Sequence, residues 1–160
     1  MTIEQVRNYL NGCGLGDRVR EFDVSSATVE LAAEALGCEG CRIAKTLSFM
    51  PKEGDGCILV VAAGDAKIDN PAFKAQFGIK AKMLSPDDAE ARIGHAVGGV
   101  CPFGVKDGAE VYLDESLRRF DVIYPACGTS NSAVELTIEE LERAAEPLGW
   151  VDVCKGWREE

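Results

Sequence analysis

Cys57-Ile-Leu-Val-Val-Ala-Ala63 is an unbroken apolar run, and Ile43-Ala-Lys-Thr-Leu-Ser-Phe49 before it also has the character of a strand. The segment between them, Pro51-Lys-Glu-Gly-Asp-Gly56, is rich in turn-forming residues. An almost wholly apolar run predicts a central strand that is buried on both faces. Because short connections between strands force antiparallel pairing, part of the sheet is expected to be antiparallel.

Further helix and strand signals lie on both sides of these two runs. Capping residues or an N-terminal proline predict helices over about 2–11, 25–37, 69–77, 85–94 and 137–147. Extended segments are expected at 18–23, 110–113, 121–124, 133–136 and 150–154. A short helical piece is expected at 115–119, between the second and third of these segments. The predicted fold is α/β, with a mixed, mostly antiparallel sheet that is curled or barrel-like and has flanking helices. The 160 residues are most economically a single domain, 1–160.

The formal net charge of −10 excludes attraction of nucleic acid by the overall field, because phosphate binding depends on lysine and arginine. An RNA contact would need a local patch, for which the candidates are Lys74, Lys80, Lys82 and Lys106. No apolar run approaches the roughly 20 residues that cross a bilayer, and the N-terminus lacks the layout of a signal peptide. The expected location is cytoplasmic, with no membrane partner.

Seven cysteines, an odd number in a chain expected to be cytosolic, argue against a disulfide framework. Cys38-Glu-Gly-Cys41 is a single C-x-x-C pair, whereas a structural zinc site needs a second pair or a suitably spaced histidine. The only histidine, His95, is distant in the sequence. The pair is therefore interpreted as incidental to a helix end, with a redox pair or a zinc site as the alternatives, and no metal site is predicted.

Ile43-Ala-Lys-Thr-Leu47 contains a K-T-L segment, and Gly98-Gly-Val-Cys-Pro102 is a G-x-x-x-P loop. In this order the two motifs resemble those of the YbaK/EbsC family, the prolyl-tRNA-synthetase-associated editing domains. Gly64-Asp-Ala-Lys-Ile-Asp69 is similar to the G-D-x-K-x-D segment of that family. Asp114-Glu-Ser-Leu117 and the region 126–136 fall at the expected offsets, so the resemblance spans nearly the whole chain.

The resemblance implies a stand-alone hydrolase of wrongly charged tRNA that needs no metal, nucleotide or other cofactor. It also implies a sheet bent into a partial barrel. The implied partners are the acceptor end of an aminoacyl-tRNA and a prolyl- or other aminoacyl-tRNA synthetase, with the chain a monomer or a homodimer. Ala133 stands where the cysteinyl-tRNA(Pro) deacylases of the family carry an aspartate. This departure leaves serine, threonine and alanine open, beside cysteine, as the amino acid removed.

Hydrolysis of the ester between an amino acid and the terminal ribose passes through an oxyanion, which requires hydrogen-bond donors. The candidate donors are the backbone N–H groups of Gly98, Gly99, Val100 and Cys101, because glycine permits close approach and Pro102 stiffens the exit of the loop. Lys45 is expected to hold the terminal ribose-phosphate or the ester carbonyl. The expected substrate-binding residues are Thr46, Pro102, Phe103, Gly128, Asn131 and Ser132.

Cys101 and His95 suggest a different chemistry, in which a thiolate attacks and the imidazole acts as base. No third orienting residue is evident, and a residue before proline is held extended, which restricts how the thiol can be aimed. A water molecule or a group of the substrate is therefore the expected nucleophile. Two other classes stay open: a non-catalytic module of the same fold that binds tRNA or a synthetase, and a cysteine-dependent hydrolase or redox protein.

Overall fold

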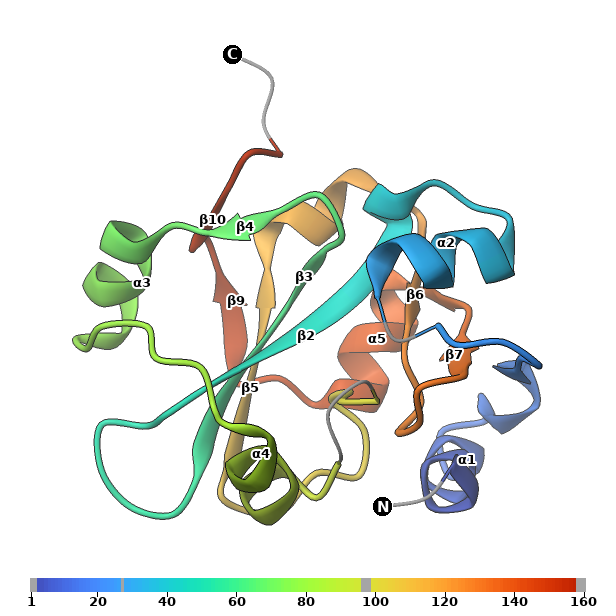
Figure 1. Ribbon diagram of the computed structural model, residues 1–160, viewed down its shortest axis with the longest axis horizontal. Helices are drawn as coiled ribbons and strands as arrows, with labels where there is room; N and C mark the ends of the chain where they lie inside the picture. Colours follow the sequence, from blue (N-terminus) through green and yellow to red (C-terminus); the bar gives the residue numbers. More distant parts are fainter. Residues whose placement is uncertain (1–2, 27, 96–98, 158–160) are drawn as a thin grey trace.

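The computed structural model describes residues 3–26, 28–95 and 99–157 (Figure 1). Its largest sheet has six strands in the order β8-β6-β2-β3-β5-β9. Two smaller ladders pair β1 with β7 and β4 with β10. The strand bounds are β1 Val19–Glu21, β2 Ile43–Phe49, β3 Cys57–Ala63, β4 Lys67–Ile68, β5 Ala109–Asp114, β6 Val122–Pro125, β7 Ser132–Val134, β8 Leu136–Thr137, β9 Gly149–Val151 and β10 Cys154–Lys155.

The hairpin of β2 and β3 forms the centre of the sheet. The two strands pair antiparallel from Ala44 opposite Ala63 to Phe49 opposite Ile58. Every residue of β3 is buried, as the apolar run predicts. Parallel strands lie on both sides, because β5 pairs with β3 and β6 pairs with β2.

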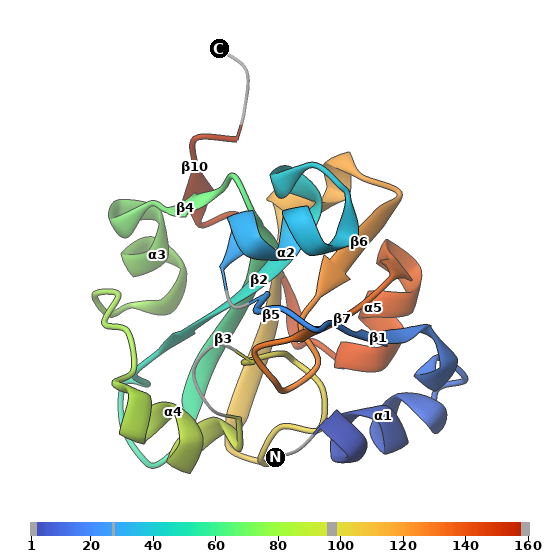
Figure 2. The ribbon, with the colours of Figure 1, turned by 45° about the vertical axis from the view of Figure 1, so that its right-hand side comes forward.

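The sheet is mixed and curled, which confirms the predicted fold class. In the described part of the chain, four of the seven strand pairings are antiparallel and three are parallel. The parallel pairings are concentrated in the six-stranded sheet, whereas both small ladders are antiparallel. The ribbon shows the strong twist between the central hairpin and its neighbours (Figures 1 and 2).

The helices flank the sheet, and most of them begin at the predicted capping residues. Their bounds are α1 Ile3–Asn11, α2 Val29–Leu36, α3 Asn70–Phe77, α4 Pro86–Ile93 and α5 Ile138–Ala145. The side chains of Asp69, Ser85 and Thr137 accept hydrogen bonds from the first turns of α3, α4 and α5. No helix in the described ranges is long and apolar enough to cross a membrane.

The start of α2 differs from the prediction. Its N-cap is Thr28, whose side chain accepts a hydrogen bond from the Leu31 N–H, and not Ser25 or Ser26. Ser26 instead donates its backbone N–H to the Ser130 carbonyl at 2.6 Å. The two serines are therefore used to fasten this loop to a distant turn, and the helix begins later.

Two predicted strands are each divided in the structure. Region 133–136 contributes β7 and β8, which pair with different partners on either side of Glu135. Region 150–154 contributes β9 and β10, and between them the Val153 N–H donates to the buried Asp114 carboxylate at 3.0 Å. The two-residue strand β4 was not predicted, because two residues carry no periodic signal. The predicted helical piece 115–119 is present as the 3-10 helix η3, Glu115–Arg119.

Candidate active site

A groove of about 410 Å³ opens between β2, α2 and the start of α4. Its size lies within the range of small-molecule sites. Small and hydroxyl-bearing side chains dominate its walls, which are formed by Ser26, Thr28, Val29, Ala32, Ile43, Ala44, Lys45, Thr46, Ser48, Met83, Leu84, Pro86, Ala89, Val100, Ala126, Ser132 and Ala133. Lys45 is the one ionisable side chain among these lining residues.

The alternation of side chains along β2 supplies one wall of the groove. Ala44, Thr46 and Ser48 share a face of the strand, because successive residues of a strand point to opposite sides. All three line the groove. The Thr46 hydroxyl oxygen is buried and has no hydrogen-bond partner among the described residues. A buried hydroxyl without a partner is unfavourable, so this atom is a candidate contact for a polar group of a ligand.

Lys45 lies on β2 opposite Ala62 of β3, and its side chain is half-buried. Its ammonium group donates to the Gly64 carbonyl at 3.4 Å. Burial lowers the pKa of Lys45, and the nearby Lys67 lowers it too, while Cys154 and Asp65 raise it. A partly desolvated ammonium beside a groove is a suitable group for holding a developing negative charge or a phosphate.

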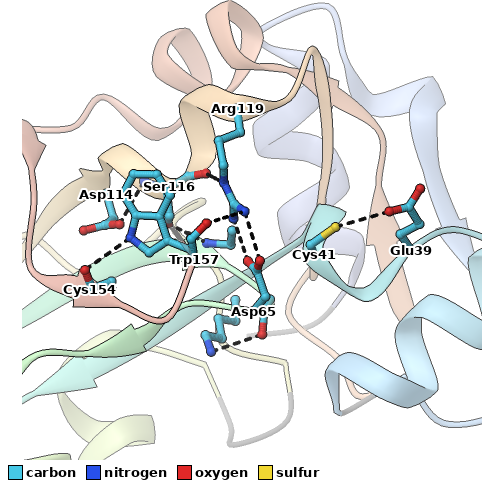
Figure 3. A network of polar contacts seen from close by, with 11 residues as sticks. Glu39, Cys41, Asp65, Asp114, Ser116, Arg119, Cys154 and Trp157 are labelled. Carbon is cyan, nitrogen blue, oxygen red and sulfur yellow. Dashed lines mark hydrogen bonds and ion pairs between the residues drawn. The ribbon is translucent and has the colours of Figure 1, made fainter. Parts of the chain in front are cut away.

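A network of polar contacts fixes the turn that carries the Gly64 carbonyl (Figure 3). The Arg119 guanidinium donates to both carboxylate oxygens of Asp65, at 2.6 and 2.9 Å. Arg119 also donates to the carbonyls of Ser116 and Trp157, at 2.9 and 3.2 Å. The hydrogen bonds from Arg119 hold the pKa of Asp65 below its usual value. Because Asp65 follows Gly64 directly, this pair positions the acceptor of Lys45.

Gly64 itself allows a close approach of two backbone segments. A Cβ atom at this position would lie 2.0 Å from the Gly40 carbonyl oxygen, so a larger residue would separate β3 from the segment that leads into β2. This close contact explains why glycine, and no larger residue, stands first in the 64–69 motif.

The described part of the glycine loop reaches the groove through one residue. Gly98 lies outside the described residues. Gly99 packs directly on another turn, since a Cβ atom on it would lie 2.4 Å from the Gly128 carbonyl carbon and from the Thr129 nitrogen. Val100, which follows, lines the groove. Glycine is therefore required at position 99 by the contact between the two backbones.

Cys101 and His95 meet, but they are buried together behind the loop. The Cys101 sulfur lies 3.5 Å from His95 Nε2, and neither residue is exposed to solvent. Burial raises the pKa of the Cys101 thiol to about 12. A thiol of this kind is neutral at physiological pH, so the geometry does not favour a cysteine nucleophile.

His95 closes the base of the loop. Its Nε2–H donates to the Phe103 carbonyl at 2.8 Å, because a carbonyl can only accept. Burial lowers the pKa of His95. Its Nδ1 atom has no partner among the residues described. The ring is thus held neutral and serves as an anchor between the two ends of the loop.

The polar turn at 129–132 reaches the groove through one of its members. Ser132 lines the groove together with Ala133. The Thr129 hydroxyl donates to the Ser132 hydroxyl at 2.8 Å, and this hydrogen bond fixes the orientation of the Ser132 side chain. Asn131 points elsewhere, because its side-chain amide donates to the Phe22 carbonyl at 3.1 Å. Asn131 therefore joins the turn to the segment before α2.

Several expected substrate-binding residues lie behind the groove surface. Phe103 is fully buried, and its ring lies 6.5 Å from that of Tyr9, so it belongs to the core. Pro102 is also buried and borders a separate cavity near Tyr9. Gly128 packs against the core, since a Cβ atom at this position would lie 2.8 Å from the Val6 side chain and 3.4 Å from His95 Nδ1. An apolar or glycine residue within a motif is as readily structural as functional, and the motif alone does not separate the two.

Other groove residues were not predicted as site residues. Ser48, Ala32 and Met83 are examples, from β2, α2 and the segment before α4. The period of two along β2 could have pointed to Ser48, since it shares a face with Thr46. The contribution of α2 and of the segment before α4 depends on tertiary packing and had no signal in the sequence.

The two cysteines of the C-x-x-C pair stand apart from the groove lining. Cys38 and Cys41 are free thiols at either end of the turn before β2. The Cys41 thiol donates to a Glu39 carboxylate oxygen at 3.6 Å. Burial raises the pKa of both thiols, which makes neither a reactive thiolate. Within ranges 3–26, 28–95 and 99–157, no cluster of three or more possible metal ligands is present.

Comparison with known proteins places this fold and site in a family. The chain is 52% identical over 157 residues to YwhH, an uncharacterized protein of Bacillus subtilis (strain 168), covering 98% of this chain and 99% of that protein. It is 32% identical over 115 residues to EbsC of Enterococcus faecalis, which is named as a proposed Cys-tRNA(Pro)/Cys-tRNA(Cys) deacylase, covering 71% of this chain and 70% of EbsC.

A solved structure shares the architecture. It is described as a proposed trans-editing enzyme for prolyl-tRNA synthetase, and it superposes with a TM-score of 0.85 at 28% identity, covering 96% of this chain and 97% of that one. A family model described as the aminoacyl-tRNA editing domain matches residues 23–144, which include β2, the glycine loop and the turn at 129–132. The chain therefore belongs to the family of YbaK-like aminoacyl-tRNA editing domains.

Proposed function

We propose that this protein is a trans-editing hydrolase that cleaves the ester bond of a mischarged aminoacyl-tRNA carrying a small amino acid. The observation that carries the proposal is the groove, which is lined both by Lys45 and by Val100 of the glycine loop. Membership of the editing-domain family and the named activity of EbsC support it. The acceptor end of the tRNA is the proposed partner, with a prolyl- or other aminoacyl-tRNA synthetase as a second one.

The chemistry follows from the few groups that the groove presents. The backbone N–H groups of the 98–101 loop stabilise the oxyanion that develops on the ester carbonyl, while Lys45 holds the carbonyl or the terminal ribose-phosphate. Since Lys45 is the one ionisable residue of the described lining, no side chain of the groove is suited to act as general base. The attacking group is therefore water, or a group of the substrate that itself activates water.

The groove favours a small and uncharged amino acid side chain. Ala32, Ala44 and Ala133 give it an apolar lining, and no carboxylate lines its described part. The hydroxyl groups of Thr46 and Ser48 are available to hydrogen-bond serine, threonine or cysteine, whereas alanine would fit by size alone. The Ser132 hydroxyl already donates to the Thr129 carbonyl, so it can offer a ligand only its second acceptor site. A site built to hydrogen-bond a substrate hydroxyl discriminates more strongly than one that selects by size, so serine and threonine are expected to exceed alanine in rate.

The test is the release of amino acid from tRNA charged with serine, threonine, alanine or cysteine. Wild type is compared with Lys45→Ala and Cys101→Ala, and Lys52→Ala serves as a matched control, because this exposed lysine lies in the turn between β2 and β3. We expect Lys45→Ala to lose about 100-fold or more in rate, while Lys52→Ala and Cys101→Ala keep activity. Absence of turnover on every tRNA, with tRNA still bound, would instead indicate a non-catalytic binding module.

A further inference from the structure

A second groove adjoins the first and shares two of its residues. It has a volume of about 300 Å³ and is lined by Lys45, Leu47, Phe49, Lys67, Ile68, Asn70, Ala81 and Met83. Lys45 and Met83 belong to both grooves. Met83 is 59% exposed, so its side chain is accessible from both grooves. A ligand that extends beyond the first groove would therefore pass Lys45 and Met83 into the second.

Two cationic side chains meet in this second groove without a fixed counter-charge. Neither Lys45 nor Lys67 forms an ion pair with any described residue. Both lysines line the same groove. Lys67 lowers the pKa of Lys45, although Cys154 and Asp65, which raise it, act more strongly. No carboxylate is among the described residues that line the groove. Two ammonium groups that line one groove, neither of them in an ion pair, can both donate hydrogen bonds to a bound anion.

Of the acidic groups considered around the two lysines, two are bound to other partners and the third is exposed on a helix. Asp65 is held by Arg119, and the Asp69 carboxylate accepts a hydrogen bond from Ala72 at the start of α3. Cys154 is a buried thiol whose pKa is raised to about 12, so it carries no charge at neutral pH. Glu30 of α2 is exposed and also acts on Lys45. In a chain of net charge −10, this groove is thus a local cationic site.

We propose that Lys67, together with Lys45, binds a phosphodiester group of the single-stranded 3′ end of the RNA in the second groove. The inference rests on the proposed function, because it follows the substrate outward from the ester in the first groove. Lysine binds phosphate as a point charge and provides several donors. Asn70 adds an amide at the same groove. The patch expected from the sequence, Lys74, Lys80, Lys82 and Lys106, contributes no residue to this lining.

The test is the salt dependence of RNA binding. Deacylated tRNA with an intact 3′ CCA end is titrated with wild type, Lys67→Gln and Lys52→Gln, and fluorescence anisotropy is measured between 50 and 200 mM salt, the range in which phosphate contacts are strongly screened. Loss of one phosphate contact to a single strand reduces the slope of log K against log salt by about 0.7. We expect this reduction in Lys67→Gln and not in Lys52→Gln, although both variants change the net charge equally. Equal slopes in the two variants would overturn the proposal.

A truncated tRNA without the 3′ CCA end locates the contact. We expect wild type and Lys67→Gln to bind this RNA with the same slope, because the phosphate that Lys67 contacts has been removed. A difference that persists would place Lys67 elsewhere on the RNA and would overturn the assignment to the 3′ end.

The binding assay also separates this inference from the proposed function, since it requires no hydrolysis. A slope change in Lys67→Gln that depends on the CCA end supports the subsite, even where no charged tRNA is hydrolysed. Hydrolysis that depends on Lys45, combined with equal slopes for Lys67→Gln and Lys52→Gln, rejects the subsite and leaves the hydrolase. In an active enzyme, Lys67→Gln is expected to raise KM with little change in kcat.

Discussion

The two walls of the main groove are held in place in different ways. On the β2 wall, Lys45 presents a charge, and its acceptor is fixed by the ion pair of Arg119 with Asp65. On the loop wall, the polypeptide backbone is presented, and the buried His95 with the Gly99 contact fixes its shape. Substitutions on the first wall should therefore act mainly through charge, and those on the second wall mainly through geometry.

On the loop wall, the largest effect is expected from Gly99→Ala. The added methyl group would overlap the backbone of Gly128 and Thr129, so the loop and this turn must move apart. We expect a rate loss of about 100-fold, comparable to the loss of one oxyanion donor, and a decrease of about 1–3 kcal/mol in the free energy of unfolding from overpacking.

Deacylation rates and urea denaturation measure these two effects. Gly149→Ala is the matched control, because a Cβ atom at Gly149 has no neighbour within 4 Å. If Gly99→Ala kept full activity, the loop would not act through its backbone geometry.

On the β2 wall, Asp65→Asn is expected to reduce the rate about tenfold, which corresponds to about 1.4 kcal/mol of barrier. Without the carboxylate charge the Gly64 turn loosens, and the pKa of Lys45 falls further, because Asp65 raises it. Both partners are partly exposed, so the ion pair should contribute only about 1 kcal/mol to stability.

The pH dependence of stability gives an independent measure. The pKa of Asp65 is lower in the folded protein than in the unfolded chain, so its contribution is complete above the unfolded value of about 3.9 and is lost as the pH falls through the folded value. Glu115→Gln is the control, since it removes a comparable surface pair with Arg118 that does not contact the Gly64 turn. A rate loss equal to that of Asp65→Asn in this control would show that surface charge alone is responsible.

His95 allows the loop wall to be tested by pH. Its pKa is lowered in the folded state, so the unfolded chain binds a proton first as the pH falls below about 6.5. Wild type should therefore lose stability between about 6.5 and the folded pKa, by up to about 1.4 kcal/mol per pH unit. His95→Gln should lack this slope, and because the chain has one histidine the comparison is unambiguous. Parallel stability curves for both proteins would mean that His95 is not held neutral.

The smallest effect is expected from Cys101→Ala. Its thiol is buried, with a pKa of about 12, so it should resist alkylation in the folded protein at pH 8 and react only after unfolding. Activity should change by less than about threefold, well below the change for a lost oxyanion donor. Rapid alkylation of Cys101 in the native state, with loss of activity, would instead support the hypothesis that Cys101 is the nucleophile.

The sequence predicts local structure here better than it predicts the site. The apolar run of β3 and the capping residues Asp69, Ser85 and Thr137 have local causes, and each lies where expected. The two-residue strand β4 has no local signal and depends on its pairing with β10.

For the site, the sequence predicts which residues belong to it, but not whether each side chain points into the groove or into the core. Lys45, Thr46, Val100 and Ser132 line the groove, whereas Phe103 turns into the core although it belongs to the same loop. The second groove could not be predicted, because Lys67 approaches Lys45 only through the pairing of β4 with β10 and the turn at Gly64.

The pairing of β1 with β7 has a consequence for synthesis of the chain. It joins Val19 to Val134, and the hydrogen bond from Ser26 to Ser130 lies beside it. The groove is therefore bounded by segments more than 100 residues apart, and contacts of such separation form late in folding. A nascent chain still on the ribosome cannot complete this site until β7 has emerged from the exit tunnel. The complete groove should thus form only after β7 has left the tunnel.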